Sequence, residues 1–229
     1  MATDRLSTHI TTGNNPSCIY IFYHFSKHYS MRLFPNLKNN LIRRKWLIIG
    51  LNVGYLTSDK EDNELYTPYY VVDHIIKYLP KDKIIWLPFD CEWSSFYQRL
   101  KEEGFNVVRS SLREGQDFFE YEPDEWDIIV SNPPFSLKDK VLERLYSFNK
   151  PFAILLPLNS LQGKTRYKYF KQGIQILSFD ARVCYHDKDH MDTVVKGSPF
   201  ATAYFCRDLL PKDLIIEKLI TYERPLISG

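Results

Sequence analysis

Residues Asp127–Phe135 read Asp-Ile-Ile-Val-Ser-Asn-Pro-Pro-Phe, and the organisation of the chain can be worked out from this stretch. Its first part, Asp127–Val130, predicts a short β-strand, because a single acid precedes an unbroken apolar run. The two prolines that follow fix φ and disfavour helix in the residue before each of them. We therefore expect a rigid, extended loop directly after the strand. In an open α/β sheet, ligands bind at such loops, outside the carboxyl ends of the strands.

Strands and helices alternate on both sides of this stretch. Before it, Thr67 is expected to cap a helix that has Pro68 at its first position. The further elements predicted are strand Lys83–Phe89, helix Glu92–Glu103, strand Asn106–Ser110, helix Leu137–Phe148, strand Phe152–Leu156, helix Ser160–Lys171, and strands Ile174–Phe179 and Phe200–Cys206. The last two strands are expected to pair antiparallel. This order predicts an α/β fold with a mostly parallel sheet, helices on both faces and an antiparallel C-terminal hairpin.

The chain has 229 residues, of which 44% are hydrophobic, which is enough for one globular domain and a short extension. Neither a helical nor a strand period holds for long in residues 1–60, so we interpret this part as an N-terminal extension. The α/β pattern fills residues 61–210. Residues 211–229 are expected to form a C-terminal tail.

The composition excludes several classes of protein. With 25% charged residues, the chain is neither disordered nor fibrous. No apolar run reaches the ~18 residues that a membrane span needs, and the polar segment Met1–Asn15 lacks the apolar centre of a secretory signal. The cysteines are scattered and form no CxxC pair. These features predict a cytoplasmic protein without a membrane partner.

The net charge of +2 conceals a local excess of positive charge. Residues 1–60 hold 8 Lys and Arg against 2 Asp and Glu, and residues 138–188 hold 10 against 4. Within the second region, residues 164–171 alternate cations with aromatic rings, a composition that suits phosphate contacts and base stacking. The alternative is an amphipathic helix with its aromatic side chains in the core. The candidate nucleic-acid contacts are Lys164, Arg166, Tyr167 and Lys168.

The loop Ser131-Asn132-Pro133-Pro134-Phe135 combines hydrogen-bond acceptors with an aromatic ring. The side-chain oxygen of Asn132 and the carbonyl of Pro133 provide two hydrogen-bond acceptors beside an aromatic plate, Phe135. Such a set suits an exocyclic amine, whose two N–H groups need two acceptors while its ring stacks on Phe135. Those bonds localise the nitrogen lone pair and favour its attack on an electrophilic methyl group. The alternative is a rigid turn without a function.

Asn132-Pro133-Pro134-Phe135 after such a strand resembles the catalytic motif of S-adenosylmethionine-dependent amino-group methyltransferases, most closely the small, phage-type DNA adenine-N6 enzymes. The resemblance covers about Glu64–Arg207 and implies a Rossmann-like class I methyltransferase domain in residues 61–210, with S-adenosylmethionine as cofactor. It implies catalytic roles for Asn132, Pro133, Pro134 and Phe135. The cofactor-binding residues that it implies are Tyr66, Thr67, Pro68, Pro88, Phe89, Asp90, Asp117 and Phe118.

The chain departs from the family at two places in the cofactor half. The family's cofactor strand usually ends in an acidic, glycine-containing turn, whereas this chain has Leu87-Pro88-Phe89-Asp90 and no glycine between Gly54 and Gly104. The acid that usually holds the ribose hydroxyls after the next strand is replaced by Arg109-Ser110-Ser111. Asp90 and Glu92 are the candidates to substitute.

The resemblance implies transfer of a methyl group to adenine N6 in nucleic acid, with DNA favoured over RNA. A similar loop serves enzymes that methylate RNA bases or protein glutamine, and a degenerate, non-catalytic nucleic-acid-binding module is a third hypothesis. The cluster Cys184, His186, Asp187, Asp189 and His190 matches no zinc spacing, so no metal is expected and a polar hairpin loop is favoured there. This loop, Tyr185–Pro199, is expected to project near the active edge and to be long enough to reach a target.

Overall fold

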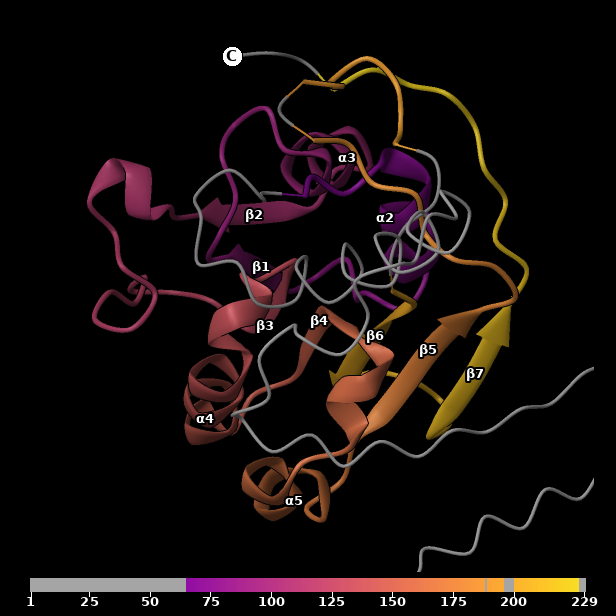
Figure 1. Ribbon diagram of the computed structural model, residues 1–229. Helices are drawn as coiled ribbons and strands as arrows, with labels where there is room; N and C mark the ends of the chain where they lie inside the picture. The colour runs from indigo at the N-terminus through magenta and orange to yellow at the C-terminus, as the bar shows by residue number, and fades with distance from the viewer. Residues whose placement is uncertain (1–64, 188, 196–199, 227–229) are drawn as a thin grey trace, which may run out of the picture. The chain divides into compact units, whose positions relative to one another are not determined.

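The computed structural model describes residues 65–187, 189–195 and 200–226 (Figure 1). The N-terminal extension predicted for residues 1–60 lies outside these residues. In chain order the elements are α2 (Tyr69–Ile76), β1 (Ile84–Leu87), α3 (Ser95–Glu102), β2 (Asn106–Arg109), η2 (Leu112–Glu114), β3 (Ile128–Ser131), η3 (Phe135–Leu137), α4 (Lys138–Phe148), β4 (Phe152–Pro157), η4 (Leu158–Leu161), α5 (Lys164–Phe170), β5 (Gln175–Phe179), β6 (Thr202–Arg207) and β7 (Leu214–Glu217).

The strands β1 to β7 form one sheet in the order β2-β1-β3-β4-β6-β5-β7. β1 pairs in parallel with β2 and with β3, and β3 pairs in parallel with β4. β6 is antiparallel to both of its neighbours, β4 and β5, while β7 is parallel to β5. The predicted α/β class, the mostly parallel sheet and the antiparallel C-terminal pairing are therefore confirmed.

The strand order reverses at β1. From β1 the chain crosses to β2 on one side and then returns to β3 on the other side, so the connections after β1 and β3 diverge. In an open α/β sheet, ligands bind outside the carboxyl ends of the strands at such a switch point. The two loops that leave the sheet there begin at Pro88 and Asn132, respectively. Both belong to stretches in which the sequence predicts site residues.

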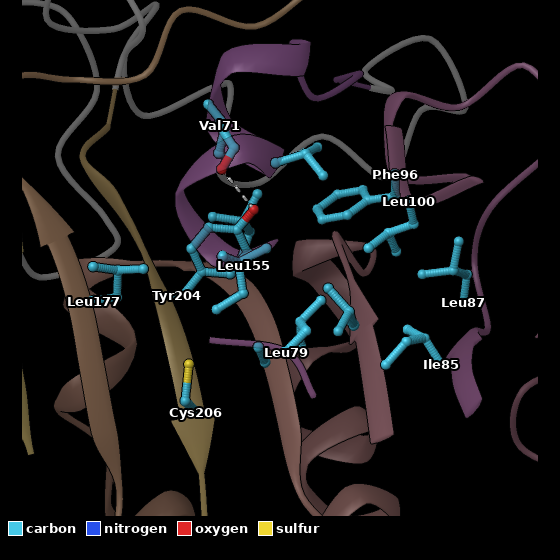
Figure 2. Packing of buried hydrophobic residues seen from close by; sticks show 14 of the residues in the cluster. Val71, Leu79, Ile85, Leu87, Phe96, Leu100, Leu155, Leu177, Tyr204 and Cys206 are labelled. Atoms are coloured by element: carbon cyan, nitrogen blue, oxygen red, sulfur yellow. Dashed lines mark hydrogen bonds between the residues drawn. The ribbon is translucent and has the colours of Figure 1, made fainter. Parts of the chain in front are cut away.

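One face of the sheet is covered by α2 and α3. Ile85 and Leu87 point to this face, because side chains alternate along a strand, and they share a buried cluster with Phe96 of α3. Figure 2 shows this layer, in which the Tyr204 hydroxyl of β6 donates a hydrogen bond to the Val71 carbonyl of α2 (3.1 Å). The bond satisfies a fully buried hydroxyl and joins the helix to the sheet.

The opposite face is covered by α4 and α5, as Figure 1 shows. Trp86 of β1 points to this side and is fully buried, with its ring centroid 5.1 Å from that of Trp126 and 5.9 Å from that of Phe148. Its indole N–H donates to the Ser110 hydroxyl just after β2 (2.9 Å). Burial of such an aromatic side chain contributes about 2–3 kcal/mol. The predicted helices on both faces are confirmed.

The start of α2 differs from the prediction. Pro68 occupies the N-cap with an extended backbone (φ −74°, ψ 153°), so the helix begins at Tyr69. Thr67 therefore lies one residue outside the position where a hydroxyl can cap the helix. Its buried Oγ1 forms no hydrogen bond with any other described residue. The predicted capping role of Thr67 is wrong, and its hydroxyl is left for another partner.

Two other helices are shorter than predicted. α3 begins three residues after Glu92, because the Ser94 hydroxyl accepts a hydrogen bond from the Tyr97 amide (3.1 Å) and caps the helix there. The helix predicted for Ser160–Lys171 is divided into the short turn η4 and α5. Within the described chain, every helix is too short or too polar to cross a membrane.

β7 lies in the stretch predicted as a tail, residues 211–229, where no strand was expected. It pairs with β5 and presents Leu214 and Ile216 to solvent. On its inner side the Glu217 carboxylate contacts His74 Nδ1 and accepts a hydrogen bond from the Tyr78 hydroxyl, both at 2.6 Å. These polar contacts anchor β7 to α2.

Candidate active site

A buried carboxylate joins the loops that follow β1 and β3. Asp90, three residues beyond β1, accepts a hydrogen bond from the Ser131 hydroxyl at the end of β3. Ser94, the cap of α3, also forms a side-chain hydrogen bond to Asp90. Only 6% of Asp90 is exposed, and burial raises its pKa to about 6. The carboxylate thus connects the end of β1, the start of α3 and the loop that contains Asn132.

Asn132 is oriented by a segment far away in the sequence. Its Nδ2 donates a hydrogen bond to the Leu65 carbonyl (3.1 Å). A carbonyl oxygen can only accept, so the amide nitrogen faces Leu65 and Oδ1 faces the other way. Oδ1 is buried and has no hydrogen-bond partner among the described residues. The amide therefore offers a fixed, unsatisfied acceptor.

The rest of the proline loop alternates between buried and exposed residues. Pro133 is buried, Pro134 is exposed and Phe135 is half-buried. The Phe135 ring meets the Phe200 ring edge-to-face, with 5.4 Å between centroids and 80° between planes. Phe200 lies just before β6 and was predicted only as the start of that strand. Its spacing in the sequence gives no sign that it contacts the proline loop.

The segment Leu65–Pro68 lies between two other parts of the site. The Leu65 carbonyl accepts the hydrogen bond from Asn132. The Tyr66 amide and carbonyl pair with the backbone of His186 (2.8 and 2.9 Å). The Tyr66 ring contacts the Trp93 ring edge-on at 5.0 Å. Thr67 and Pro68 are buried, and Thr67 Oγ1 is unpartnered among the described residues.

The connection between β5 and β6 reaches the site through His186. The His186 side chain is 2% exposed, and its Nδ1 lies 3.1 Å from the His190 carbonyl oxygen. Nδ1 therefore carries a proton in this contact, and Nε2 is buried without a partner among the described residues. In the described part of this connection, as elsewhere in the described chain, no three His, Cys, Asp or Glu side chains are grouped to hold a metal ion.

At the end of β2, the residues that replace the expected acid are engaged inside the chain. The Arg109 guanidinium pairs with Glu114 (2.6 Å), and the hydroxyls of Ser110 and Ser111 accept hydrogen bonds from Trp86 and from a backbone amide. Gln116, in the same loop, differs from them. Its Oε1 is buried and has no described partner. Gln116 could not be predicted from the sequence, because a single glutamine in a polar loop carries no recognisable pattern.

The other residues predicted to bind the cofactor lie in the loop after β1 and in the connection between β2 and β3. Pro88 is buried and Phe89 is half-buried in the loop after β1. The Phe118 ring is 2% exposed and packs 4.8 Å from the Phe89 ring, so it belongs to the core. Asp117 Oδ1 accepts a hydrogen bond from the Phe119 amide (3.0 Å), which closes a tight turn. Phe89, at the edge of this aromatic group, is the more accessible of the two rings.

Unsatisfied polar atoms gather at one edge of the sheet. Eight buried side-chain polar atoms of the described chain lack a hydrogen-bond partner. Six of them lie in segments at the carboxyl ends of the parallel strands: Thr67 Oγ1, Ser95 Oγ, Gln116 Oε1, Asn132 Oδ1, Ser160 Oγ and His186 Nε2. The other two belong to Tyr69 and Arg144. Each such atom costs about 1–3 kcal/mol, and buried polar groups are normally paired. This edge is therefore the candidate ligand site.

The four candidate nucleic-acid contacts all lie on α5, and they differ in their exposure to solvent. Lys164 and Lys168 are exposed, and Tyr167 is 68% exposed. Arg166 is 9% exposed; its guanidinium donates hydrogen bonds to the Ser160 carbonyl (2.7 Å) and Asp139 (2.6 Å), and also to the carbonyl of residue 162. These contacts stabilise the connection into α5. The structure therefore corrects the expectation for Arg166, whose charge is turned inward.

The comparisons with known proteins found similarity only among solved structures. No protein-family model and no curated protein matches the sequence. The chain is similar to a dimethyladenosine transferase from Plasmodium falciparum, with 14% identity over 65% of this chain and 64% of that chain and a TM-score of 0.39. It is also similar to a type I restriction-modification methyltransferase subunit from Streptococcus thermophilus, with 11% identity over 80% and 53% and a TM-score of 0.40.

A third similar structure is the 23S rRNA methyltransferase ErmE, with 12% identity over 70% of this chain and 69% of that chain and a TM-score of 0.35. The chain spans less than two thirds of the length of the first two structures, 64% and 53%.

Proposed function

We propose that this chain transfers a methyl group from S-adenosylmethionine to the N6 amine of adenine in nucleic acid, with DNA favoured over RNA. The observation that carries the proposal is the orientation of Asn132. Its amide nitrogen is bonded to the Leu65 carbonyl, and its buried oxygen has no partner among the described residues. An exocyclic amine is the kind of donor that this oxygen lacks.

Pro133 is the residue after Asn132. Its carbonyl and Asn132 Oδ1 therefore offer two acceptors to the two N–H groups of an amine. Both bonds leave the nitrogen lone pair pointing away from the acceptors. The half-buried Phe135 ring beside them supplies an apolar surface for the base. These residues position the amine and stabilise the charge that develops on it, which requires no covalent intermediate.

Bound S-adenosylmethionine supplies a methyl group on a positively charged sulfur. The amine held by Asn132 and Pro133 would attack this methyl carbon, so that the C–S bond would break as the N–C bond forms and the proton released by the amine would pass to water. Such a cofactor site is supported by Thr67 Oγ1 and Gln116 Oε1, which are buried without a partner in the described part of the chain and suit hydroxyl and ammonium donors. The further residues proposed to line the site are Tyr66, Pro68, Pro88, Phe89 and Asp117, with the predicted residue Phe118 packed behind Phe89 in the core.

The nucleic-acid contacts that we propose are Lys164, Tyr167 and Lys168 of α5. All three are exposed, and α5 follows the turn that leaves the carboxyl end of β4. Lysines beside an exposed tyrosine suit a phosphate backbone and an unpaired base. Arg166 is left out because its guanidinium is engaged inside the chain. Because the described part of residues 61–210 contains no inserted recognition domain, we expect the recognised sequence to be short or to be read by a partner.

The test is transfer of a labelled methyl group from S-adenosylmethionine to a panel of acceptors: duplex DNA, single-stranded DNA, RNA and a glutamine-containing peptide. We expect DNA to be labelled, and labelling by Asn132→Ala to be lower by about 10²–10³-fold because one of the two acceptors is lost. Labelling of RNA or the peptide alone would reassign the substrate. Failure to bind the cofactor, measured by calorimetry, would support the non-catalytic binding module instead.

A further inference from the structure

Asp90 is a buried carboxylate that has no direct part in the proposed transfer. It accepts hydrogen bonds from two hydroxyls, those of Ser131 and Ser94, and 6% of it is exposed. The family resemblance implies a contact between Asp90 and the cofactor. The contacts in the structure point instead toward the proline loop, because Ser131 directly precedes Asn132.

We propose that Asp90 is a positioning residue, which acts through the Ser131 hydroxyl to fix where Asn132 Oδ1 and the Pro133 carbonyl lie. The inference rests on the proposed function. Ser131 is fully buried and is the last residue of β3, paired with β4. The loop is thus held at Ser131 by Asp90 and at the next residue by the Leu65 carbonyl. The two anchors, Asp90 and the Leu65 carbonyl, come from different segments of the chain and bind consecutive residues of the loop.

The backbone of the loop explains why side-chain anchors are needed. Pro133 and Pro134 have no N–H group, so half of the residues 132–135 cannot donate a backbone hydrogen bond. Fixed φ angles make the loop rigid, but they do not fix the direction in which it leaves the strand. The side chains of Ser131 and Asn132 supply that direction. A displacement of about 1 Å at a reacting group costs about 10²-fold in rate.

The experiment compares Asp90→Ala, Ser131→Ala and the double variant with the wild-type chain. Calorimetry measures the affinity for S-adenosylmethionine, and single-turnover labelling measures the rate constant of methyl transfer at saturating cofactor. We expect each single variant to transfer the methyl group about 10- to 100-fold more slowly. The double variant should be no slower than Asp90→Ala, because both substitutions remove the same hydrogen bond between Ser131 and Asp90. Cofactor affinity should change by less than about threefold, since RT ln 3 is under 1 kcal/mol.

Tyr146→Phe is the matched control. It removes one partly buried hydroxyl bond, to the Gly173 carbonyl (2.9 Å), at the opposite edge of the sheet, and should leave the transfer rate unchanged. A cofactor affinity that falls in Asp90→Ala but not in Ser131→Ala would make Asp90 a cofactor contact and overturn the inference. Additive losses of rate in the double variant would overturn it as well.

Amide hydrogen exchange tests the same inference without any activity. The Leu137 amide bonds to the Pro134 carbonyl (3.0 Å), so exchange at residues 135–138 reports on the loop. We expect exchange there to be about tenfold faster in Asp90→Ala and in Ser131→Ala than in Tyr146→Phe, as expected when a local opening becomes more favourable by about 1.4 kcal/mol. Unchanged exchange overturns the inference. If the wild-type chain binds cofactor but labels no acceptor, the proposed function fails, and the exchange result alone decides the role of Asp90.

Discussion

At the scale of single residues, the Asn132 amide has a hydrogen-bonded nitrogen and an oxygen that has no partner among the described residues, and other side chains at this edge are similar. Thr67 Oγ1 and Gln116 Oε1 are also buried without a partner in the described chain. Without a ligand, such atoms lower the stability of the fold, whereas a ligand that donates hydrogen bonds would restore it. We therefore expect stability and ligand affinity to respond in opposite directions when these atoms are removed.

Thr67→Val tests this expectation, because valine has the shape of threonine without the hydroxyl. We expect the free energy of unfolding to rise by about 1 kcal/mol and the affinity for S-adenosylmethionine to fall by about tenfold. Urea denaturation and calorimetry measure the two quantities. Thr202→Val is the matched control, since the Thr202 hydroxyl already accepts a bond from Tyr185 (2.8 Å) and its loss should destabilise the chain. A destabilised Thr67→Val chain with unchanged affinity would show that the hydroxyl has a structural partner.

The raised pKa of Asp90 predicts a specific pH dependence. Burial raises this pKa from 3.8 to about 6, so between about pH 4 and pH 6 the folded chain keeps a proton that the unfolded chain has released. The contribution of Asp90 to the free energy of unfolding is therefore fully present below pH 4 and is lost as the pH rises through 6. It amounts to about 3 kcal/mol for a pKa difference of this size.

Asp90→Asn cannot ionise, so its free energy of unfolding, relative to that of the wild-type chain, should increase between pH 4 and pH 6 and then stay level. Urea denaturation of both chains at several pH values measures this difference. A difference that does not vary with pH would mean that Asp90 is ionised in the folded chain throughout the range.

At the scale of elements, the turn between β4 and α5 depends on one buried arginine and one glycine. The Arg166 guanidinium bonds to the turn η4 and to Asp139 of α4. A Cβ at Gly163 would lie 2.4 Å from Arg166 Nη2 and 2.6 Å from its Cζ, both far inside van der Waals contact. Gly163 is therefore required by the approach of Arg166, which holds α5 where it presents Lys164 and Lys168.

Gly163→Ala should consequently destabilise the chain by about 2–3 kcal/mol, because the guanidinium must leave its buried partners. In an Arg166→Ala background the same substitution should cost less than about 1 kcal/mol, since the group that it strikes is gone. Urea denaturation of the four chains gives both values. Equal costs in the two backgrounds would contradict the proposed contact.

The sequence predicts elements well where an apolar period is continuous and poorly where long-range contacts decide. Ile84–Leu87 and Phe152–Pro157 are buried on both faces and were recognised as strands from their unbroken apolar runs. β7 was missed, because its four residues become a strand only beside β5 and through the contacts of Glu217 with α2. The acceptor of Asn132 was predicted from the proline motif, but its orientation depends on Leu65, 67 residues away.

At the scale of the whole molecule, the near-zero net charge hides an exposed basic patch on α5. Lys164 and Lys168 flank the exposed Tyr167, while the positive charge of Arg166 is turned inward. A count of charges along the sequence could not show which of these residues are exposed, because their exposure depends on which side of the helix faces Asp139. The patch should act through the phosphate backbone, whose contribution to binding depends on salt.

The double variant Lys164→Ala/Lys168→Ala should reduce the slope of log K against log salt for DNA binding by about 2, since each phosphate contact contributes about 0.9. Fluorescence anisotropy with a labelled oligonucleotide at several salt concentrations measures the slope. Lys212→Ala removes an exposed lysine at the opposite edge of the sheet and should leave it unchanged. An unaltered slope in the double variant would place the DNA on another surface.

The central claim, that Asn132 and Pro133 present a base amine for methylation, is tested most directly by identifying the product. DNA incubated with the chain and S-adenosylmethionine is digested to nucleosides, and mass spectrometry determines which atom carries the new methyl group. We predict N6-methyladenine, with its yield lowered about 10²–10³-fold in Asn132→Ala. A methyl group on a ring nitrogen or a ring carbon, or a yield that Asn132→Ala leaves unchanged, would contradict the claim.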